Sequence, residues 1–179
     1  AQAAIGLPPK VQACIPRRAG ELIRRYDLEE ATLRLAEELR LEVARLALPL
    51  FESSGGEYGI TCGQVDPRAG DDVDAMVAAA QRLARLTPNL SVKIPVTAGG
   101  VEAIRELTAQ GICTTATVSF SVPQVVTVCD AYRDGLRRLP AHLRPPRLQA
   151  VLMVGRLDDH LRIWVEEHDA DIPEEVIAQ

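Results

Sequence analysis

The chain has 179 residues, of which 47% are apolar and 25% charged, and its formal net charge is −5. This composition is ordinary for a globular protein, and the length suffices for one domain with a hydrophobic core. The negative charge argues against nucleic acid as a partner, and no apolar run approaches the roughly 20 residues that a membrane span needs. We therefore expect a single domain that binds neither nucleic acid nor a membrane.

The first half of the chain alternates between short apolar runs and longer helical patterns. Ala3–Gly6 predicts a short strand. From Asp27 to Phe51, apolar residues recur at three- and four-residue spacing among charged ones, which predicts a helix. After a Ser- and Gly-rich turn, Tyr58–Val65 predicts a strand and Asp71–Leu86 the following helix.

The second half repeats the same alternation three times. The predicted strands are Leu90–Val96, Ile112–Phe120 and Leu148–Gly155. The predicted helices that follow them are Gly99–Gln110, Val122–Arg138 and Arg156–Glu167. Pro140–Arg147 predicts a loop, and Asp169–Gln179 is an acidic tail.

Strands separated by helices of this length are typical of βαβ units and a parallel sheet. No Gly-rich dinucleotide or phosphate-loop fingerprint follows the first predicted strand, which argues against a nucleotide-binding doubly wound fold. The remaining common α/β architecture is the (β/α)8 TIM barrel. A closed barrel needs eight strands and about 250 residues, whereas only about five βα units fit here. We therefore expect residues 1–179 to form a single barrel domain that lacks strands before Ala1 and after Gln179.

The four cysteines show neither a CxxC pair nor a histidine at metal-ligand spacing; they are Cys14, Cys62, Cys113 and Cys129. We interpret them as isolated thiols that fill space in the core, and not as zinc ligands or disulfide partners. Free thiols, and an N-terminal segment unlike a secretion signal, favour a cytoplasmic protein. We predict no metal site, and we expect all three histidines on the surface, namely His142, His160 and His168.

Lysine is rare in this chain, with two lysines against eighteen arginines, and one of the two, Lys93, lies inside an apolar strand. Burial of an ammonium is costly unless its charge is paired or given up, so burial favours the neutral amine. Only the neutral amine attacks a carbonyl to form a Schiff base. Alternatively, the aliphatic stem of Lys93 packs against the protein while its amine reaches water.

Alternate residues of a barrel strand point inward, and catalytic residues gather at the carboxyl ends of the strands. In Ile112–Phe120 one parity carries hydroxyl groups and the other is apolar; the sets are Thr115, Thr117, Ser119 and Ala116, Val118, Phe120. The apolar set should pack against the helices. We therefore expect the hydroxyl set to face the barrel interior.

The same alternation in the two preceding strands turns Ser91 and Lys93 inward and places Gln64 near a carboxyl end. Lys93, Gln64, Thr115 and Thr117 should then converge on one interior from three adjacent strands. Barrel interiors are normally packed with branched apolar residues, so a polar set predicts a functional site. The alternative is a polar but inert layer of the barrel.

Four sequence blocks together extend from about Tyr58 to His160. They are Gly63–Arg68, Val92–Thr97, Gly111–Gln124 and Met153–Asp158. In their order and spacing they resemble the transaldolase family, which includes the related fructose 6-phosphate aldolases. The lysine strand with its downstream glycine turn is the most specific of the four.

The resemblance implies a (β/α)8 barrel and a class I aldol mechanism on a sugar phosphate, with no metal or other cofactor, within the pentose phosphate pathway. Carried over by position, Lys93 matches the Schiff-base lysine, and Thr117 matches a threonine that orients the catalytic water. Arg156 matches an arginine that binds the substrate phosphate; alternatively it forms a surface ion pair with a nearby aspartate. Gln64 stands where transaldolases carry a glutamate and the fructose 6-phosphate aldolases a glutamine.

The chain departs from the family pattern at several positions. Thr115 replaces an asparagine that contacts the substrate near the lysine, and Leu7 stands where an asparagine usually precedes a proline. We retain Thr115 and Ser119 as candidate substrate-binding residues. Gln64 cannot exchange a proton near neutral pH, so it can only position a water or a hydroxyl. The general acid or base is expected on an aspartate upstream of Ala1.

Two functions remain open from the sequence. The first is a transaldolase-like enzyme that transfers or cleaves a dihydroxyacetone-type unit of a sugar phosphate through an imine at Lys93. The second is a non-catalytic or divergent homologue that binds a phosphorylated ligand or acts on an unusual substrate. A buried lysine in an arginine-rich chain favours the first. A small-molecule sugar phosphate is then the expected partner, and the oligomeric state, including a homo-oligomer, is left open.

Overall fold

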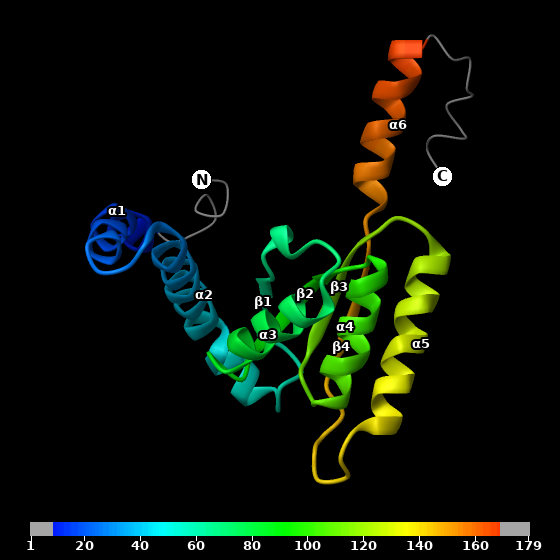
Figure 1. Cartoon of the computed structure of the whole chain (residues 1–179), viewed down its shortest axis with the longest axis horizontal. Coiled ribbons are helices and arrows are strands. Elements are labelled where there is room, and N and C mark those ends of the chain that lie inside the picture. The colour runs from blue at the N-terminus through cyan, green and yellow to red at the C-terminus, as the bar shows by residue number, and fades with distance from the viewer. Residues whose placement is uncertain (1–8, 169–179) are drawn as a thin grey trace.

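The computed structural model describes residues 9–168, except for the side chains of residues 10 and 11. Its elements follow one another as α1 (Pro9–Ile23), α2 (Leu28–Ser53), β1 (Thr61–Gln64), a 3-10 turn (Pro67–Ala69), α3 (Val73–Ala84), β2 (Leu90–Pro95), α4 (Ala98–Ala109), β3 (Thr114–Ser119), α5 (Val122–Arg138), β4 (Leu148–Leu152) and α6 (Val154–His168). Figure 1 shows α1 and α2 at one side of the sheet, whereas α6 extends away beyond the other side.

The four strands form one parallel sheet in the order β1-β2-β3-β4, and each pair of neighbours is joined by a helical crossover. This arrangement confirms the predicted α/β class with successive βα units, as expected for part of a (β/α)8 barrel. Four of the five predicted strands are present. The fifth, Ala3–Gly6, lies outside the described residues, as does the predicted acidic tail.

One helix was missing from the sequence prediction. Residues Pro9–Ile23 form α1, although Pro16 lies inside it and interrupts the helical pattern. The helix is held against α2 by Arg18, whose guanidinium donates to both carboxylate oxygens of Glu38 over 2.6 Å. Proline has a low helix propensity, so Pro16 argues against a helix in the sequence. The contact with α2 that stabilises the helix is remote in sequence and leaves no trace in the local pattern.

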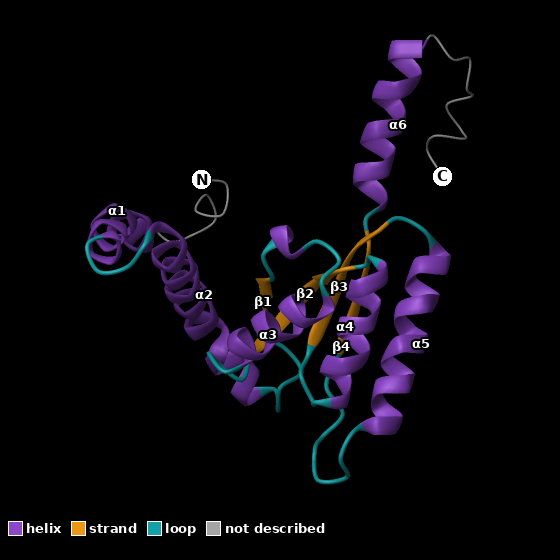
Figure 2. Ribbon diagram, viewed as in Figure 1, coloured by secondary structure: helices purple, strands orange, loops and turns teal. Residues whose placement is uncertain are grey.

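The hydrophobic core lies between the sheet and helices α3, α4 and α5, which cover one side of the strands (Figure 2). The sheet supplies alternate residues to it, including Val65, Val92, Ile94 and Ala116, as the apolar parity predicts. The helices supply their apolar stripes, namely Met76, Ala80, Leu83, Ala103, Ile104, Leu107 and Val128. Burial of these side chains leaves the alternate strand residues on the opposite side of the sheet.

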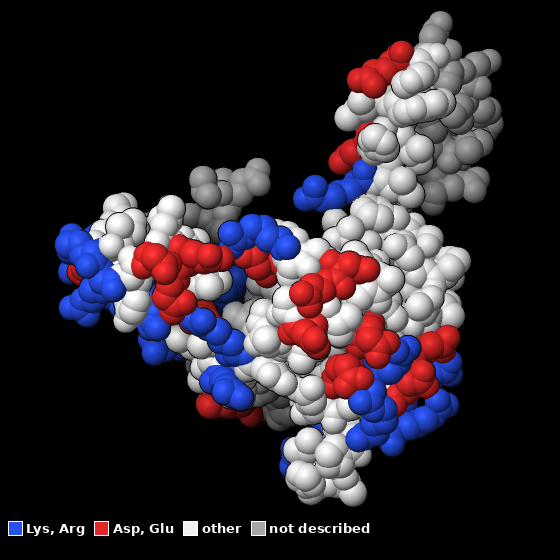
Figure 3. Space-filling model, in the orientation of Figure 1, with Lys and Arg blue, Asp and Glu red and all other residues white. Residues whose placement is uncertain are grey.

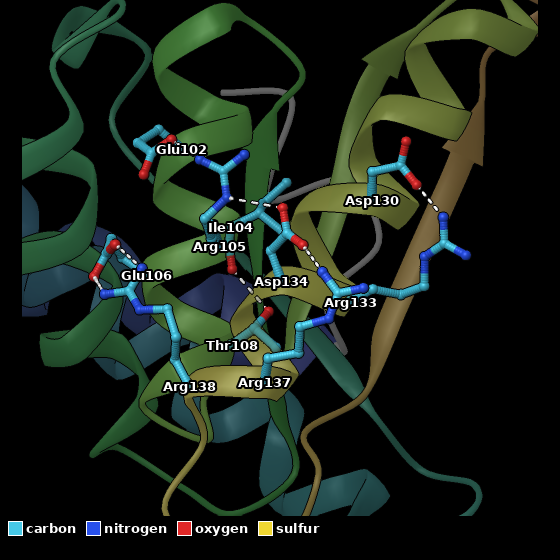
Figure 4. A network of polar contacts seen from close by, with 10 residues as sticks. All are labelled: Glu102, Ile104, Arg105, Glu106, Thr108, Asp130, Arg133, Asp134, Arg137 and Arg138. Carbon is cyan, nitrogen blue, oxygen red and sulfur yellow. Dashed lines mark hydrogen bonds and ion pairs between the residues drawn. The ribbon is translucent and has the colours of Figure 1, made fainter.

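Helices α4 and α5 pack closely because α5 carries Gly135 at the contact. A Cβ atom added there would lie 2.5 Å from the carbonyl oxygen of Arg105 and 2.6 Å from the Cβ of Thr108. Ion pairs flank this contact, as Figure 4 shows: Arg138 binds Glu106, with a shortest distance of 2.5 Å, and Arg105 reaches Asp134. Acidic and basic side chains therefore interleave over these two helices (Figure 3).

The turn between β2 and α4 is fixed by two side chains. Thr97 caps α4 by accepting a hydrogen bond from the Gly100 amide over 3.1 Å. Asp71, in the loop before α3, accepts from the Gly99 amide over 2.6 Å. Hydrogen bonds from the Thr97 hydroxyl and from the Gly99 amide hold the pKa of Asp71 below its ordinary value. The loop after β1 is thereby tied to the carboxyl end of β2.

The cysteines do not fill the core as predicted: Cys14, Cys62 and Cys129 are exposed and Cys113 is half-buried, all as free thiols. Gly63 in β1 and Val65 directly after it face the helices, so Cys62, at the alternate position, lies on the side of the sheet opposite the core. The predicted surface positions of the three histidines are confirmed. Within residues 9–168, none of the helices combines the length and hydropathy of a membrane-spanning segment.

Substitution of Gly135→Ala should destabilise the protein. The added methyl group must displace the Arg105 carbonyl or the Thr108 side chain, and overpacking of this kind costs about 1–3 kcal/mol. Gly155→Ala in α6 is the matched control, because nothing lies within 4 Å of its added Cβ. Urea denaturation followed by circular dichroism should show a lower free energy of unfolding for Gly135→Ala and an unchanged or higher one for Gly155→Ala. Equal values for the two variants would contradict the close packing.

Substitution of Asp71→Asn should remove stability in a pH-dependent manner. Because the pKa of Asp71 is lowered on folding, its stabilising contribution is present above the unfolded pKa of about 4 and is lost as the pH falls through the folded value. The melting temperature of Asp71→Asn should therefore lie below that of the parent at pH 7, and the difference should shrink below about pH 4. Asp159→Asn, at an exposed position of α6, is the matched control and should leave the melting temperature at pH 7 unchanged.

Candidate functional site

The side of the sheet opposite the core carries polar side chains from all four strands, and we call it the polar face. Four of them occupy one continuous row of paired residues, which we call the register row: Gln64 pairs with Lys93, Lys93 with Thr115, and Thr115 with Gln149. Paired residues of a parallel sheet point to the same side. The register therefore brings three of the predicted site residues, Gln64, Lys93 and Thr115, side by side.

Lys93 lies near the centre of the register row and is half-buried. Among the described residues, no carboxylate forms an ion pair with its amine. Its backbone carbonyl accepts a hydrogen bond from the side-chain amide of Gln64 over 3.2 Å. The Gln64 side chain is therefore tied to the backbone of Lys93, while the Lys93 amine forms no ion pair within the described residues.

Thr115 is the centre of a hydrogen-bonded cluster that crosses the sheet. Its hydroxyl lies 2.8 Å from the Ser91 hydroxyl and donates to the Gln149 side-chain oxygen over 2.8 Å. The Cys62 thiol approaches the same hydroxyl to 3.6 Å. With a relative exposure of 4%, Thr115 is engaged with protein groups on every neighbouring strand.

Thr117 and Ser119 lie further along β3. Thr117 pairs with Pro95, is buried, and has its hydroxyl 3.9 Å from the Met153 sulfur. Ser119 is fully buried, and its hydroxyl finds no hydrogen-bond partner within the described part of the chain. The predicted packing of Val118 and Phe120 against the helices is wrong, because Val118 is 45% and Phe120 39% exposed.

Val118 and Phe120 are exposed because the pairing of β3 with β4 is irregular between Ala116 and Ser119. Val118 adopts φ 62°, a left-handed conformation that β-branched residues rarely take. Such an interruption breaks the two-residue period on which the parity prediction rests.

Arg156 lies apart from the register row. It is exposed in the first turn of α6 and lines a surface hollow with Phe120, Leu157, Asp159, His160 and Ile163. The alternative ion pair with a neighbouring aspartate does not form among the described residues, since Asp158 pairs with Arg162 instead. The guanidinium of Arg156 therefore remains available to an anion.

The electrostatics at the β1 end of the row are set by arginines. Arg40 of α2 donates to the Gln64 backbone carbonyl over 3.0 Å, and burial lowers the pKa of its guanidinium. The adjacent Asp66 accepts hydrogen bonds from the Arg68 side chain and amide, which lower its pKa to about 2. The Asp-Pro-Arg part of the first sequence block thus forms a local capped turn rather than part of the polar face.

The chemistry that this face supports follows from its residue types. Within residues 9–168, no group of three or more His, Cys, Asp or Glu side chains could hold a metal ion. The register row offers the amine of Lys93, the hydroxyl of Thr115 and the amides of Gln64 and Gln149. The hydroxyl and the two amides do not exchange protons near neutral pH. Lys93 is therefore the one candidate nucleophile of the register row.

Two polar contributions were missed from the sequence. Gln149 completes the register row, but the parity of its strand could not be fixed until the pairing with Thr115 was known. The alternation of Leu148, Ala150 and Leu152 with Gln149 was the available signal. Asp71 binds an amide that is remote in sequence, and no local pattern indicates such a contact.

Comparison with known proteins relates these features to one family. A sequence model of the transaldolase/fructose-6-phosphate aldolase family matches residues 16–177. A transaldolase of Thiobacillus denitrificans is 42% identical over 118 residues, which are 63% of this chain and 33% of that protein. Transaldolase 1 of Streptomyces avermitilis is 35% identical over 121 residues, and a transaldolase of Acidothermus cellulolyticus 36% over 118.

The matched parts are 66% and 65% of this chain, and 32% of each of these two relatives. The chain thus spans about a third of the length of the curated relatives that it matches. The family match nevertheless extends over most of the chain, including every strand of the sheet. The chain belongs to the transaldolase/fructose-6-phosphate aldolase family.

Proposed function

We propose that this chain contributes the Schiff-base lysine of a transaldolase-type enzyme that transfers or cleaves a three-carbon ketol unit of a sugar phosphate. The observation that carries the proposal is the place of Lys93. Lys93 is half-buried, its position in the register row lies between Gln64 and Thr115, and its amine has no carboxylate partner among the described residues. The family match supports the same class of enzyme.

In the proposed reaction the neutral amine of Lys93 attacks the ketose carbonyl, and the resulting carbinolamine loses water to form an imine. The protonated imine withdraws electrons from the neighbouring carbon–carbon bond. A base removes the proton of the hydroxyl on the far carbon, the bond breaks, and an aldehyde leaves. The enamine that remains on Lys93 then attacks an acceptor aldehyde or takes up a proton, and hydrolysis restores the free amine.

Gln64 and Thr117 are proposed to position the water that enters and leaves during imine formation. Neither group is a base near neutral pH, because an amide and an alcohol hydroxyl do not titrate there. Proton transfer, which typically contributes 10²–10⁴-fold to rate, must therefore come from a group outside the register row. The predicted upstream aspartate stays a prediction.

Arg156 is proposed to bind the phosphate of the substrate. A guanidinium offers paired donors that match phosphate oxygens, and that of Arg156 has no protein partner among the described residues. Thr115 and Ser119, predicted to contact the substrate, are both buried, and for Thr115 we propose that it supports its neighbours on the polar face. Cytoplasmic location stays a prediction.

Trapping with borohydride tests the proposal directly. The protein is incubated with fructose 6-phosphate and sodium borohydride, and intact-mass and peptide spectrometry locate any adduct. We expect a stable adduct, of the whole ketose or of its three-carbon fragment, on Lys93, because borohydride reduces an imine to an unreactive secondary amine.

Lys93→Arg serves as the control, since it keeps the positive charge but cannot form the imine. It should give no adduct. Absence of an adduct on the parent protein across fructose 6-phosphate, dihydroxyacetone and related hydroxyketones would contradict the catalytic role. That result would favour the second hypothesis, a non-catalytic or divergent homologue.

A further inference from the structure

The register row ends on Gln149, a residue with no role in the function proposed above. Gln149 lies on β4, pairs with Thr115 and is exposed on the polar face. Its side-chain oxygen accepts the Thr115 hydroxyl hydrogen over 2.8 Å. Thr115 in turn is held by the Ser91 hydroxyl, also over 2.8 Å, so the orientation of the Gln149 amide is fixed from the neighbouring strands.

The hydrogen bond determines which end of the amide faces the polar face. A primary amide has one acceptor oxygen and two N–H donors. With the oxygen engaged by Thr115, the donors of Gln149 are the groups left for a ligand, and they have no partner among the described residues. Thr115 itself, being buried, uses its hydroxyl within the protein.

Lys93 and Gln149 are separated by one strand. Neighbouring strands lie about 4.8 Å apart, so their backbones are about 10 Å apart across the sheet. The hydrogen bond to Thr115, on the strand between them, draws the amide of Gln149 from β4 toward β2. A ketose joined to the amine of Lys93 that extends over β3 would bring its oxygen atoms toward this amide.

We propose that Gln149 determines specificity by donating hydrogen bonds to a hydroxyl or carbonyl oxygen of the ketose at Lys93. The inference rests on the function proposed above for its ligand class. The residue that recognises the sugar is then on β4, one strand beyond Thr115 on β3. The hydroxyl of Thr115 then acts as a positioning group, since it sets the orientation of the amide.

Two substitutions separate a binding role from a structural one. Gln149→Glu keeps an oxygen that can accept from Thr115 but removes the N–H donors. Gln149→Leu removes both functions at similar size. Gln81→Leu is the matched control, because Gln81 lies in α3 and its amide bonds Gln110, away from the polar face.

The measurement is made in a Lys93→Met background, which cannot form an imine and so reports reversible binding alone. Fructose 6-phosphate is titrated into each protein and the dissociation constant is determined by calorimetry. Loss of one or two hydrogen bonds should weaken binding about 3- to 30-fold in both Gln149 variants. Gln81→Leu should leave it unchanged, and thermal unfolding of Gln149→Glu should match that of the background protein.

Unchanged affinity in the Gln149 variants would overturn the inference, as would failure of the Lys93→Met protein to bind fructose 6-phosphate at all. Weaker binding accompanied by an equal loss in thermal stability would also overturn it, because Gln149 would then be structural. The borohydride experiment on the parent protein is independent. If no adduct forms there while the Gln149 variants still bind more weakly, the catalytic proposal fails and the role of Gln149 stands.

Discussion

The pairing register of the parallel sheet is the constraint on which the candidate site depends. A shift of one residue in the pairing of β2 with its neighbours would send Lys93 into the core and bring Val92 or Ile94 to the polar face. The register is fixed by the alternate apolar residues of the strands, which pack against α3, α4 and α5. The same residues that hold the helices on one side of the sheet therefore align the amine, the hydroxyl and the amides on the other.

Most of the sheet could be predicted because its strands alternate cleanly between apolar and polar residues. Val92 and Ile94 against Ser91 and Lys93 give an unambiguous period of two, and the parity of β2 is confirmed. The prediction failed for Val118, where a local irregularity in pairing breaks the period.

Features that depend on contacts remote in sequence could not be predicted. Helix α1 contains Pro16 and is held by an ion pair with α2, so its local signal is weak. Cys62 was assigned to the core because cysteine is usually buried, yet its neighbours Gly63 and Val65 occupy that side of β1. Within the candidate site, the position of Lys93 was readable from composition and pattern, whereas Gln149 required the observed pairing of β3 with β4.

The bond between Asp71 and the Gly99 amide joins two loops that belong to successive βα units. The first loop follows the strand that carries Gln64, and the second follows the strand that carries Lys93. The two backbones approach so closely that a Cβ atom added to Gly99 would lie 2.0 Å from the carbonyl oxygen of Asp71. Neither loop can therefore change its backbone path without disturbing the other. New activities in barrels arise by variation of such loops. Here a change in one of these two loops would require a matching change in the other.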